Sequence, residues 1–319
     1  MNMETKKTSL PAPPPEDSCA VMFSGGLDST VAAIQMARRF RRLVLVTADF
    51  PYTINLRAST RNLARLQAAF PKTSIEQRLV NASPLRRRVW AGFCRDYFTF
   101  CQGRGLGLTC LGCKISMMLA AIKVCLRERL GHLSNGMTRS QSGHPDCLPE
   151  MVNRFGEFMA EYNIVYINEV YDIRTRGEEN RLLEQYGLGQ GLRIGASSVT
   201  HQPRCFVGPY TKLWLAAAPV DKKHMLAYFD SRRPVMRSLL APDEVLKSGL
   251  RGRWELRTVV DESRAGRHTH EFSPIIDRAL GLSLSPLWWA SKIVLALHAD
   301  AGHGLEPRPN RRKTRDQLG

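Results

Sequence analysis

Short apolar runs alternate with amphipathic stretches over the first half of the chain. The runs have the composition of buried strands, and the stretches between them carry apolar residues three to four apart, which is typical of helices. The predicted strands are Cys19–Phe23, Leu43–Phe50, Ser74–Asn81, His132–Met137 and Ile164–Val170. The predicted helices are Val31–Phe40, Asn55–Phe70, one marked by Leu85, Val89, Phe93, Tyr97 and Phe100, then Lys114–Leu130 and Leu148–Tyr162. This alternation predicts an α/β fold: a doubly wound, Rossmann-like parallel sheet with helices on both faces.

The rest of the chain divides by composition. Residues 1–17 are rich in proline and polar residues, which predicts a flexible tail. Residues 18–219 hold the alternating pattern and are expected to form the main domain. Residues 220–305 are expected to form a basic, mainly helical C-terminal extension, and residues 306–319 a disordered basic tail.

The charge of the chain is unusual for a globular protein. Lysine and arginine number 46 against 29 acidic residues, which gives a formal net charge of +17 over 319 residues. This excess favours an anionic partner, either a nucleic acid or a phosphorylated small molecule. The first residues lack the apolar stretch of a signal peptide, and the longest apolar runs fall short of the roughly 18 residues of a membrane span. We therefore expect a cytoplasmic protein that does not enter a membrane.

The segment SGGLDST, Ser24–Thr30, lies where a phosphate site is expected in such a fold. It follows the first predicted strand and opens a helix, so backbone amides and the helix N-terminus face one point. Gly25 and Gly26 let an anion approach the backbone closely. Hydroxyl donors come from Ser24, Ser29 and Thr30. The segment therefore predicts a cradle for pyrophosphate.

Asp28 is the unexpected member of this segment, because a carboxylate repels phosphates unless a cation lies between them. We expect Asp28 to hold Mg²⁺, directly or through water. A Walker A loop is excluded, since no lysine follows the glycines at the required spacing. A plain turn that caps the helix is the alternative interpretation of the segment.

The segment resembles the SGGxDS signature of the PP-loop ATP pyrophosphatase superfamily, which is adenine nucleotide alpha hydrolase-like. The matching residues are Ser24, Gly25, Gly26, Asp28 and Ser29. The resemblance implies that residues 18–219 bind ATP and cleave it to AMP and pyrophosphate. It also implies that the end of the second strand reads the adenine base, through Thr47, Ala48 and Asp49. The superfamily includes base-thiolating, lysidine-forming, nitrile-forming and amide-forming enzymes, and the loop alone does not choose among them.

Three cysteines bear on that choice. Cys110 and Cys113 form a C-x-x-C motif that we expect at the mouth of the Lys114–Leu130 helix, whose N-terminus favours thiolates. Cys205 follows in the loop-like string THQPRC. Three cysteines can hold a [4Fe–4S] cluster with one iron left open, whereas a four-cysteine zinc site needs a second pair that the sequence lacks. Packed thiols without a metal are the alternative, and the spacing of Cys147 does not justify it as a fourth ligand.

This arrangement resembles the tRNA-thiolating branch of the superfamily, in which such cysteines bind a cluster or carry sulfur. The resemblance implies an ATP-dependent sulfurtransferase that adenylates a nucleobase carbonyl and replaces its oxygen with sulfur, with tRNA as the substrate. Neither a zinc ribbon nor a THUMP-type RNA domain accompanies the motif. Thiolation of a free purine or pyrimidine nucleotide therefore stays open, as does an amide- or nitrile-forming ligase with zinc at the C-x-x-C. A non-enzymatic nucleotide-binding module is a third alternative. A sulfur-donor protein and a homodimer stay open as well.

Two further segments are candidates for substrate contact. The polar segment Asn135–Asp146 follows a predicted strand, so we expect it to line the substrate site with Arg139 and Gln141. Arg204, beside Cys205, is a candidate for phosphate contact.

Overall fold

The computed structural model describes residues 17–51, 53–54, 56–101, 107–139, 144–173, 175–188, 204–205, 221–241 and 257–258. The chain divides into two units, Met1–Asp261 and Glu262–Gly319, and every described residue belongs to the first. The fold below is that of the first unit.

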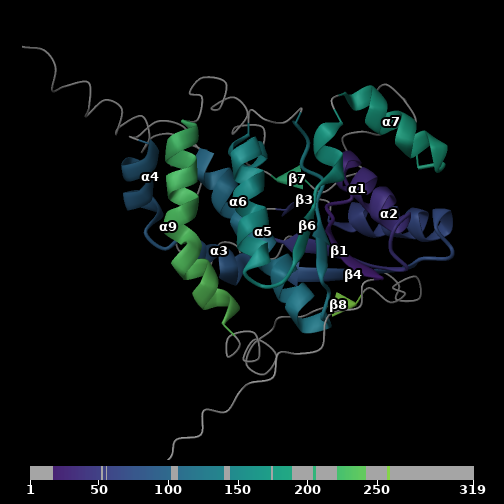
Figure 1. The fold of residues 1–319 in the computed structure, drawn as a ribbon, viewed down its shortest axis with the longest axis horizontal. Coiled ribbons are helices and arrows are strands. Elements are labelled where there is room, and N and C mark those ends of the chain that lie inside the picture. Colours follow the sequence, from purple (N-terminus) through teal and green to yellow (C-terminus); the bar gives the residue numbers. More distant parts are fainter. Residues whose placement is uncertain are drawn as a thin grey trace, which may run out of the picture. The chain divides into compact units, whose positions relative to one another are not determined.

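A mixed sheet lies at its centre, with strand order β6-β5-β1-β2-β4-β8 (Figure 1). The strands are β1 Ser18–Met22, β2 Arg42–Asp49, β4 Ser74–Asn81, β5 His132–Ser134, β6 Val165–Ile167 and β8 Arg257–Thr258. The pairings within this sheet are parallel except that of the short β8 with β4. β1 pairs with β2 on one side and with β5 on the other, so the strand order reverses between β1 and β5. Ligands of open α/β sheets bind at this switch point, at the carboxyl ends of the strands.

Helices cover both faces of the sheet. One face carries α1 Leu27–Ala37, α2 Arg57–Ala69 and α7 Arg176–Gln185, and the other carries α3 Ser83–Val89, α5 Gly107–Glu128, α6 Pro149–Ala160 and α9 Lys222–Leu240. Each face of the sheet carries its own hydrophobic cluster, and the side chains of β1 alternate between the two. Cys19 and Val21 belong to the cluster under α1, α2 and α7, and Ala20 belongs to the cluster on the opposite face. A strand buried on both faces reads as a continuous apolar run, which is why the pattern located it. The predicted doubly wound α/β fold is confirmed.

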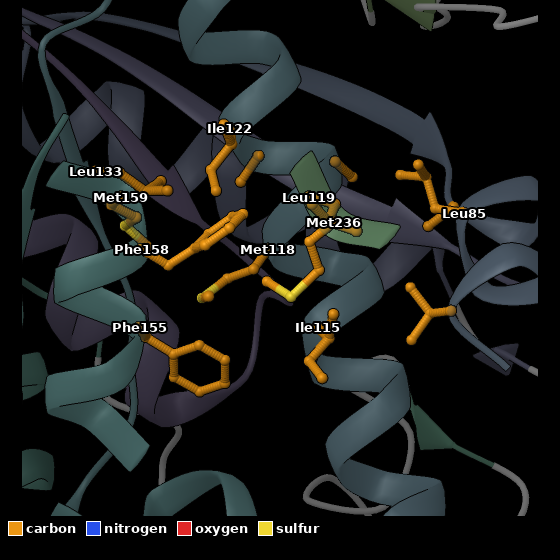
Figure 2. Packing of buried hydrophobic residues seen from close by; sticks show 14 of the residues in the cluster. Leu85, Ile115, Met118, Leu119, Ile122, Leu133, Phe155, Phe158, Met159 and Met236 are labelled. Atoms are coloured by element: carbon orange, nitrogen blue, oxygen red, sulfur yellow. The ribbon is translucent and has the colours of Figure 1, made fainter. Parts of the chain in front are cut away.

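The helix α5 lies at the centre of the larger hydrophobic cluster (Figure 2). Its buried residues pack with Phe155 and Phe158 of α6 and with Met236 of α9. In the described part of the chain, α5 alone has the length and hydropathy of a membrane span, but 67% of that window is buried inside the protein. Its apolar composition is therefore accounted for by the core.

Two predicted helices have different limits in the structure. The segment expected to form one helix from Leu85 to Phe100 is two, α3 and α4 Phe93–Cys101. The chain turns between them at Gly92, whose φ of 82° is one that only glycine adopts readily. The helix expected from Lys114 begins at Gly107, because Leu108 and Leu111 are buried against the core and extend its apolar face. The C-x-x-C motif therefore lies within the first turns of α5 and not in a loop before it.

The helix α9 shares the hydrophobic core of α5, through Met225, Tyr228 and Phe229 among others. Its Asp221 cap accepts hydrogen bonds from the backbone N–H groups of Lys223 and His224, which fixes where the helix begins. The expected helical character of this part of the C-terminal region is confirmed. The limits of the remaining domains stay predictions.

A buried ion pair fastens α9 to α4. The guanidinium of Arg232 lies 3.0 Å from the carboxylate of Asp96, and the two side chains are only 7% and 3% exposed. The same guanidinium donates to the carbonyl oxygens of Val89 and Ala91, at 3.4 and 3.2 Å. Arg232 therefore holds the turn between α3 and α4 in place.

Replacing Arg232 with methionine is expected to lower the free energy of unfolding by about 3 to 5 kcal/mol, because the buried carboxylate of Asp96 loses its closest cation and keeps the longer contact with the exposed Arg95, at 3.5 Å. The matched change Arg154→Met removes surface pairs with Glu157 and Asp230 and is expected to cost about 1 kcal/mol or less. Urea unfolding at pH 7 measures both losses. Equal losses for the two variants would contradict the assignment, and the double variant Arg232→Met with Asp96→Leu is expected to recover most of the stability.

Candidate functional site

The segment Ser24–Thr30 follows β1 and leads into α1, at the switch point of the sheet. Gly26 is the residue before α1 and has an extended backbone, with φ −76° and ψ 171°. The first amides of α1 therefore open toward the carboxyl edge of the sheet, where an anion interacts favourably with the helix N-terminus. The structure thus brings the predicted phosphate residues to the expected place, and their role toward ATP stays a prediction.

The hydroxyl groups of this loop are divided between two tasks. Ser29 and Thr30 are buried and donate to the carbonyl oxygen of Gly26, at 3.1 and 2.8 Å. Ser24 is exposed, and its Oγ lies 3.1 Å from the Oγ of Ser29 and accepts from the N–H of Gly26 at 3.2 Å. Ser29 and Thr30 therefore shape the loop, whereas the hydroxyl of Ser24 lies on its exposed side, and contact of Ser24 with a ligand stays a prediction.

Two glycines let other elements approach the loop closely. Gly25 has a φ of 73°, and a Cβ there would lie 2.6 Å from the Cα of Ser59 in α2. Gly136 follows β5, and a Cβ there would lie 2.6 Å from the backbone of Asp28 and Ser29. The loop after β5 is therefore pressed against the first turn of α1. This contact places the start of the predicted substrate segment beside the predicted phosphate cradle.

A buried polar network supports the loop from below, and the sequence did not indicate it. The amide nitrogen of Gln77 in β4 donates to the hydroxyls of Thr47 and Ser59, at 2.8 and 2.9 Å. Thr47 in turn donates to the carbonyl oxygen of Phe23 at 2.6 Å, and Ser59 donates to that of Leu56 at 2.7 Å. Two series of hydrogen bonds therefore begin at the side chain of Gln77. One leads through Thr47 to the end of β1, and the other leads through Ser59 to the start of α2.

The same network reaches the phosphate loop through α2. Asn62, one turn after Ser59, donates through its side-chain amide to the carbonyl oxygen of Gly25. Thr47, Ser59 and Gln77 are each at most 2% exposed. Thr47, expected to lie near adenine, is therefore committed to holding the end of β1. Ala48 and Asp49, which complete the expected adenine-reading residues, are half-buried at the carboxyl end of β2.

Cys110 and Cys113 lie on one face of α5, at a spacing of three residues, and both are half-buried. Lys114 shares that face and is also half-buried. Because α5 precedes the parallel strand β5, its N-terminus lies at the carboxyl edge of the sheet, the edge that carries Ser24–Thr30. The structure therefore brings the C-x-x-C motif to the same edge as the phosphate loop.

Cys147 connects these two parts of the site. It ends the short helix η2, Pro145–Cys147, which packs against α5, and it is 2% exposed. Burial raises the pKa of its thiol well above the ordinary value; the carboxylates of Asp146 and Asp28 raise it further, and the ammonium of Lys114 opposes them. A carboxylate of the phosphate loop and a lysine of the cysteine face thus both act on this thiol. Cys147 is kept protonated, which suits packing better than metal ligation.

Cys205 lies in the two-residue strand β7, which pairs with β3, Thr53–Ile54. β3 follows the carboxyl end of β2, so the backbone of Cys205 is brought to the neighbourhood of the predicted adenine-reading residues. Its side chain, like that of Arg204, lies outside the described part of the structure, as does Gln141. Among the residues that are described, no three His, Cys, Asp or Glu side chains gather as a metal site. The shared ligation of a cluster by Cys110, Cys113 and Cys205 stays a prediction.

Arg139 is described, and it lies on the outside of the segment after β5. Its guanidinium is 3.3 Å from the carboxylate of Asp172 and lies over the ring of Tyr171, 5.4 Å from the ring centroid. Tyr171 donates from its hydroxyl to the carbonyl oxygen of Cys147 at 2.9 Å. Arg139 therefore braces η2, and a direct contact with substrate stays a prediction.

The SGGLDST motif after β1 and the strand order of the sheet agree in the family that they resemble. The chain resembles the PP-loop ATP pyrophosphatases. No protein-family model matches it. A 7-cyano-7-deazaguanine synthase of Polaromonas naphthalenivorans is 27% identical over 137 residues, which are 41% of this chain and 57% of that relative.

Two solved structures with a distantly similar backbone fold are a 4-thiouridine synthetase and a U34-tRNA thiolase. A 4-thiouridine synthetase, solved with RNA and ATP, has a TM-score of 0.46 at 16% identity, over 73% of this chain and 54% of that one. The U34-tRNA thiolase NcsA of Methanococcus maripaludis, solved with its [4Fe–4S] cluster, has a TM-score of 0.35 at 12% identity, over 73% of this chain and 70% of that one. The likeness to all three proteins is distant.

Proposed function

We propose that this PP-loop protein is an ATP-dependent enzyme that adenylates a carbonyl oxygen of a nucleobase and replaces that oxygen with sulfur. The observation that supports it is the position of Cys110 and Cys113, on the face of α5 that also carries Lys114, at the sheet edge where Ser24–Thr30 opens α1. Activation and sulfur transfer need such closeness, because an adenylated intermediate must meet the sulfur before water reaches it.

The proposed reaction has two steps. The substrate carbonyl oxygen attacks the α-phosphorus of ATP, and pyrophosphate leaves from the cradle of Ser24 and the first amides of α1. A sulfur nucleophile then adds to the carbon that bears the adenylated oxygen, and AMP departs with that oxygen. Asp28 is proposed to hold the Mg²⁺ that neutralises the leaving pyrophosphate.

The donor set at the cysteines matches the chemistry of sulfur delivery. Cys110 and Cys113 provide two half-buried sulfurs one turn apart, close to the positive N-terminal end of α5. With Cys205 as a third ligand they would hold a [4Fe–4S] cluster, which supplies an open iron for sulfide. The role of the protein residues is to hold that sulfur at the sheet edge where the adenylated base lies.

The substrate is proposed to be tRNA, and the charge of the chain favours it over a free nucleotide. A net charge of +17 is far more than one nucleotide needs for binding, whereas a polynucleotide uses many cations. A sulfur-donor protein and a homodimer are compatible with this proposal and are not required by it.

A nitrile-forming ligase is the second candidate. It is favoured by the 27% identity to a 7-cyano-7-deazaguanine synthase, and it would use the same loop for adenylation with a different nucleophile. In that case the C-x-x-C would hold zinc. The two candidates therefore differ in the metal at α5.

Anaerobic purification of the full chain separates them. Iron and acid-labile sulfide in the purified protein support thiolation, whereas stoichiometric zinc without colour supports the ligase. We expect Cys110→Ser and Cys113→Ser each to lose the iron and the sulfur transfer while ATP binding persists, because the phosphate loop does not depend on either sulfur. Thr109→Ala, a half-buried neighbour in the same turn, is the control for disturbance of the helix. Full sulfur transfer by either serine variant would refute the assigned role.

A further inference from the structure

The helices α3 and α4 carry a continuous row of aromatic rings that reaches the surface. The ring of Trp90 stacks on that of Phe93 with centroids 4.9 Å apart and planes 22° apart. Phe93 is followed by Tyr97 at 6.1 Å, and Tyr97 by Phe98 at 5.6 Å. Phe98 is 61% exposed and is one of two large apolar side chains described as exposed. We call Trp90, Phe93, Tyr97 and Phe98 the aromatic row.

Arginines lie close to the row in the chain, in the last turn of α3 and in α4. The guanidinium of Arg86 lies over the ring of Trp90, 4.3 Å from the ring centroid. Arg87 and Arg88 are exposed in the last turn of α3, and the side chain of Arg95 in α4 is 76% exposed. The acidic residue of these two helices, Asp96, is buried and pairs with Arg232 at 3.0 Å and more loosely with Arg95, at 3.5 Å. The exposed charge beside the aromatic row is therefore positive.

This combination differs from an ordinary exposed phenylalanine. Single apolar side chains are common on protein surfaces and need no partner. Here the exposed ring is held by an aromatic neighbour, and exposed guanidinium groups flank the row. Flat apolar rings with cations beside them match a partner that offers flat rings joined by negative charges, which is the chemistry of unpaired nucleotides.

The position of the row also suits the site at the sheet edge. α4 ends at Cys101, and α5 with its C-x-x-C begins at Gly107. Five residues between the two helices can span at most about 20 Å. A nucleic acid strand bound on α4 would therefore lie within a few nucleotides of the N-terminus of α5. The contacts of Arg232 with Asp96 and with the carbonyl oxygens of Val89 and Ala91 hold α3 and α4 in a fixed relative position. The arginines and the rings are therefore positioned before a ligand binds.

We propose that the aromatic row, with Arg87, Arg88 and Arg95, binds a single-stranded segment of the RNA substrate. The exposed ring of Phe98 stacks on an unpaired base, and the arginines contact neighbouring phosphates. The proposal rests on the proposed function, because it names the surface by which an adenylating enzyme engages a polynucleotide and not a free nucleotide.

Fluorescence anisotropy with a labelled single-stranded RNA of about 12 nucleotides tests the proposal, since such a length covers a stacking surface of this kind. Phe98→Ala is expected to weaken binding about 5- to 150-fold, the range for loss of one stacked base. Arg87→Glu with Arg88→Glu is expected to weaken binding and to reduce the salt slope by about 0.7 for each phosphate that the arginines no longer neutralise. Arg41→Glu is the matched control, because its side chain is 87% exposed at the opposite, amino-terminal edge of the sheet.

Several results would overturn the proposal. Variants of the row that bind RNA as the wild type does would exclude this surface, and a wild type that binds no RNA even at low salt would exclude the partner. Size-exclusion chromatography that shows a wild-type dimer and a monomeric Phe98→Ala would assign the row to a second copy of the chain. Pyrophosphate release from ATP is scored separately: its absence in the wild type refutes the proposed function, whatever the RNA result.

Discussion

Replacing Asp28 with alanine is expected to abolish the release of pyrophosphate from ATP while the free energy of unfolding changes by about 1 kcal/mol or less. The carboxylate lies half-exposed in the first turn of α1, where its contribution to stability is the favourable interaction with the helix N-terminus. At the same point it would repel the phosphates of ATP unless Mg²⁺ lies between them. Loss of the carboxylate therefore removes the metal that neutralises pyrophosphate as it leaves.

Two comparisons make this expectation specific. Asp28→Asn keeps the size and most of the hydrogen bonding but not the charge, so it is expected to fail like the alanine variant. Asp17→Ala removes a 72% exposed carboxylate at the opposite, amino-terminal edge of the sheet and is expected to release pyrophosphate normally. A coupled pyrophosphate assay measures all three, and urea unfolding checks that they fold. Wild-type release by Asp28→Ala would remove this residue from the mechanism.

The parts of the fold that the sequence could predict are those with a strong local signal. β1 and β2 are buried on both faces, so each has the sequence of an apolar run bounded by turn residues. The phosphate loop is recognisable because its glycines and hydroxyls are contiguous in the chain. Gly25 has the positive φ and the close approach to α2 that such a loop requires.

The parts that the sequence could not predict depend on contacts between distant segments. The break at Gly92 interrupts an apolar spacing that continues from Val89 to Phe93, so periodicity alone predicts one helix where there are two. The start of α5 lies before the predicted one, since glycines in the preceding string are typical of a loop. Burial of Leu108 and Leu111 against the core outweighs that local preference.

Gln77 is the clearest residue that sequence reasoning missed. A polar residue in a predicted strand is ordinarily assigned to an exposed face. Its burial follows only from the register of β4 on β2, which sets Gln77 opposite Leu45 and beneath Ser59 of α2. The directions of its hydrogen bonds are fixed, because the hydroxyls of Thr47 and Ser59 already donate to backbone carbonyl oxygens and can only accept from it.

Replacing Gln77 with glutamate is therefore expected to cost more than a single hydrogen bond. A carboxylate cannot donate, so Thr47 and Ser59 would have to turn toward it and release the carbonyl oxygens of Phe23 and Leu56. The introduced group would also be charged at a position that is 2% exposed, and burial of this degree raises the pKa of a carboxyl by about 3 to 5 units. Each unit corresponds to about 1.4 kcal/mol, so we expect a loss of about 4 to 7 kcal/mol at alkaline pH and weaker ATP binding, because the end of β1 is no longer held.

The pH dependence of that loss distinguishes the buried charge from a mere packing defect. The folded state of Gln77→Glu binds its extra proton more tightly than the unfolded state, whose carboxyl has a pKa of about 4.3. The loss relative to the wild type is therefore smallest below about pH 4, grows by about 1.4 kcal/mol for each pH unit, and levels off above the raised pKa. Urea unfolding across this pH range measures it, with Gln185→Glu, at an exposed position at the end of α7, as the control that is expected to change the free energy of unfolding by about 1 kcal/mol or less. A loss of stability that is constant with pH would contradict the buried donor role of Gln77. If folded Gln77→Glu has the wild-type KM for ATP, the hydrogen bonds of Gln77 do not support ATP binding by the phosphate loop.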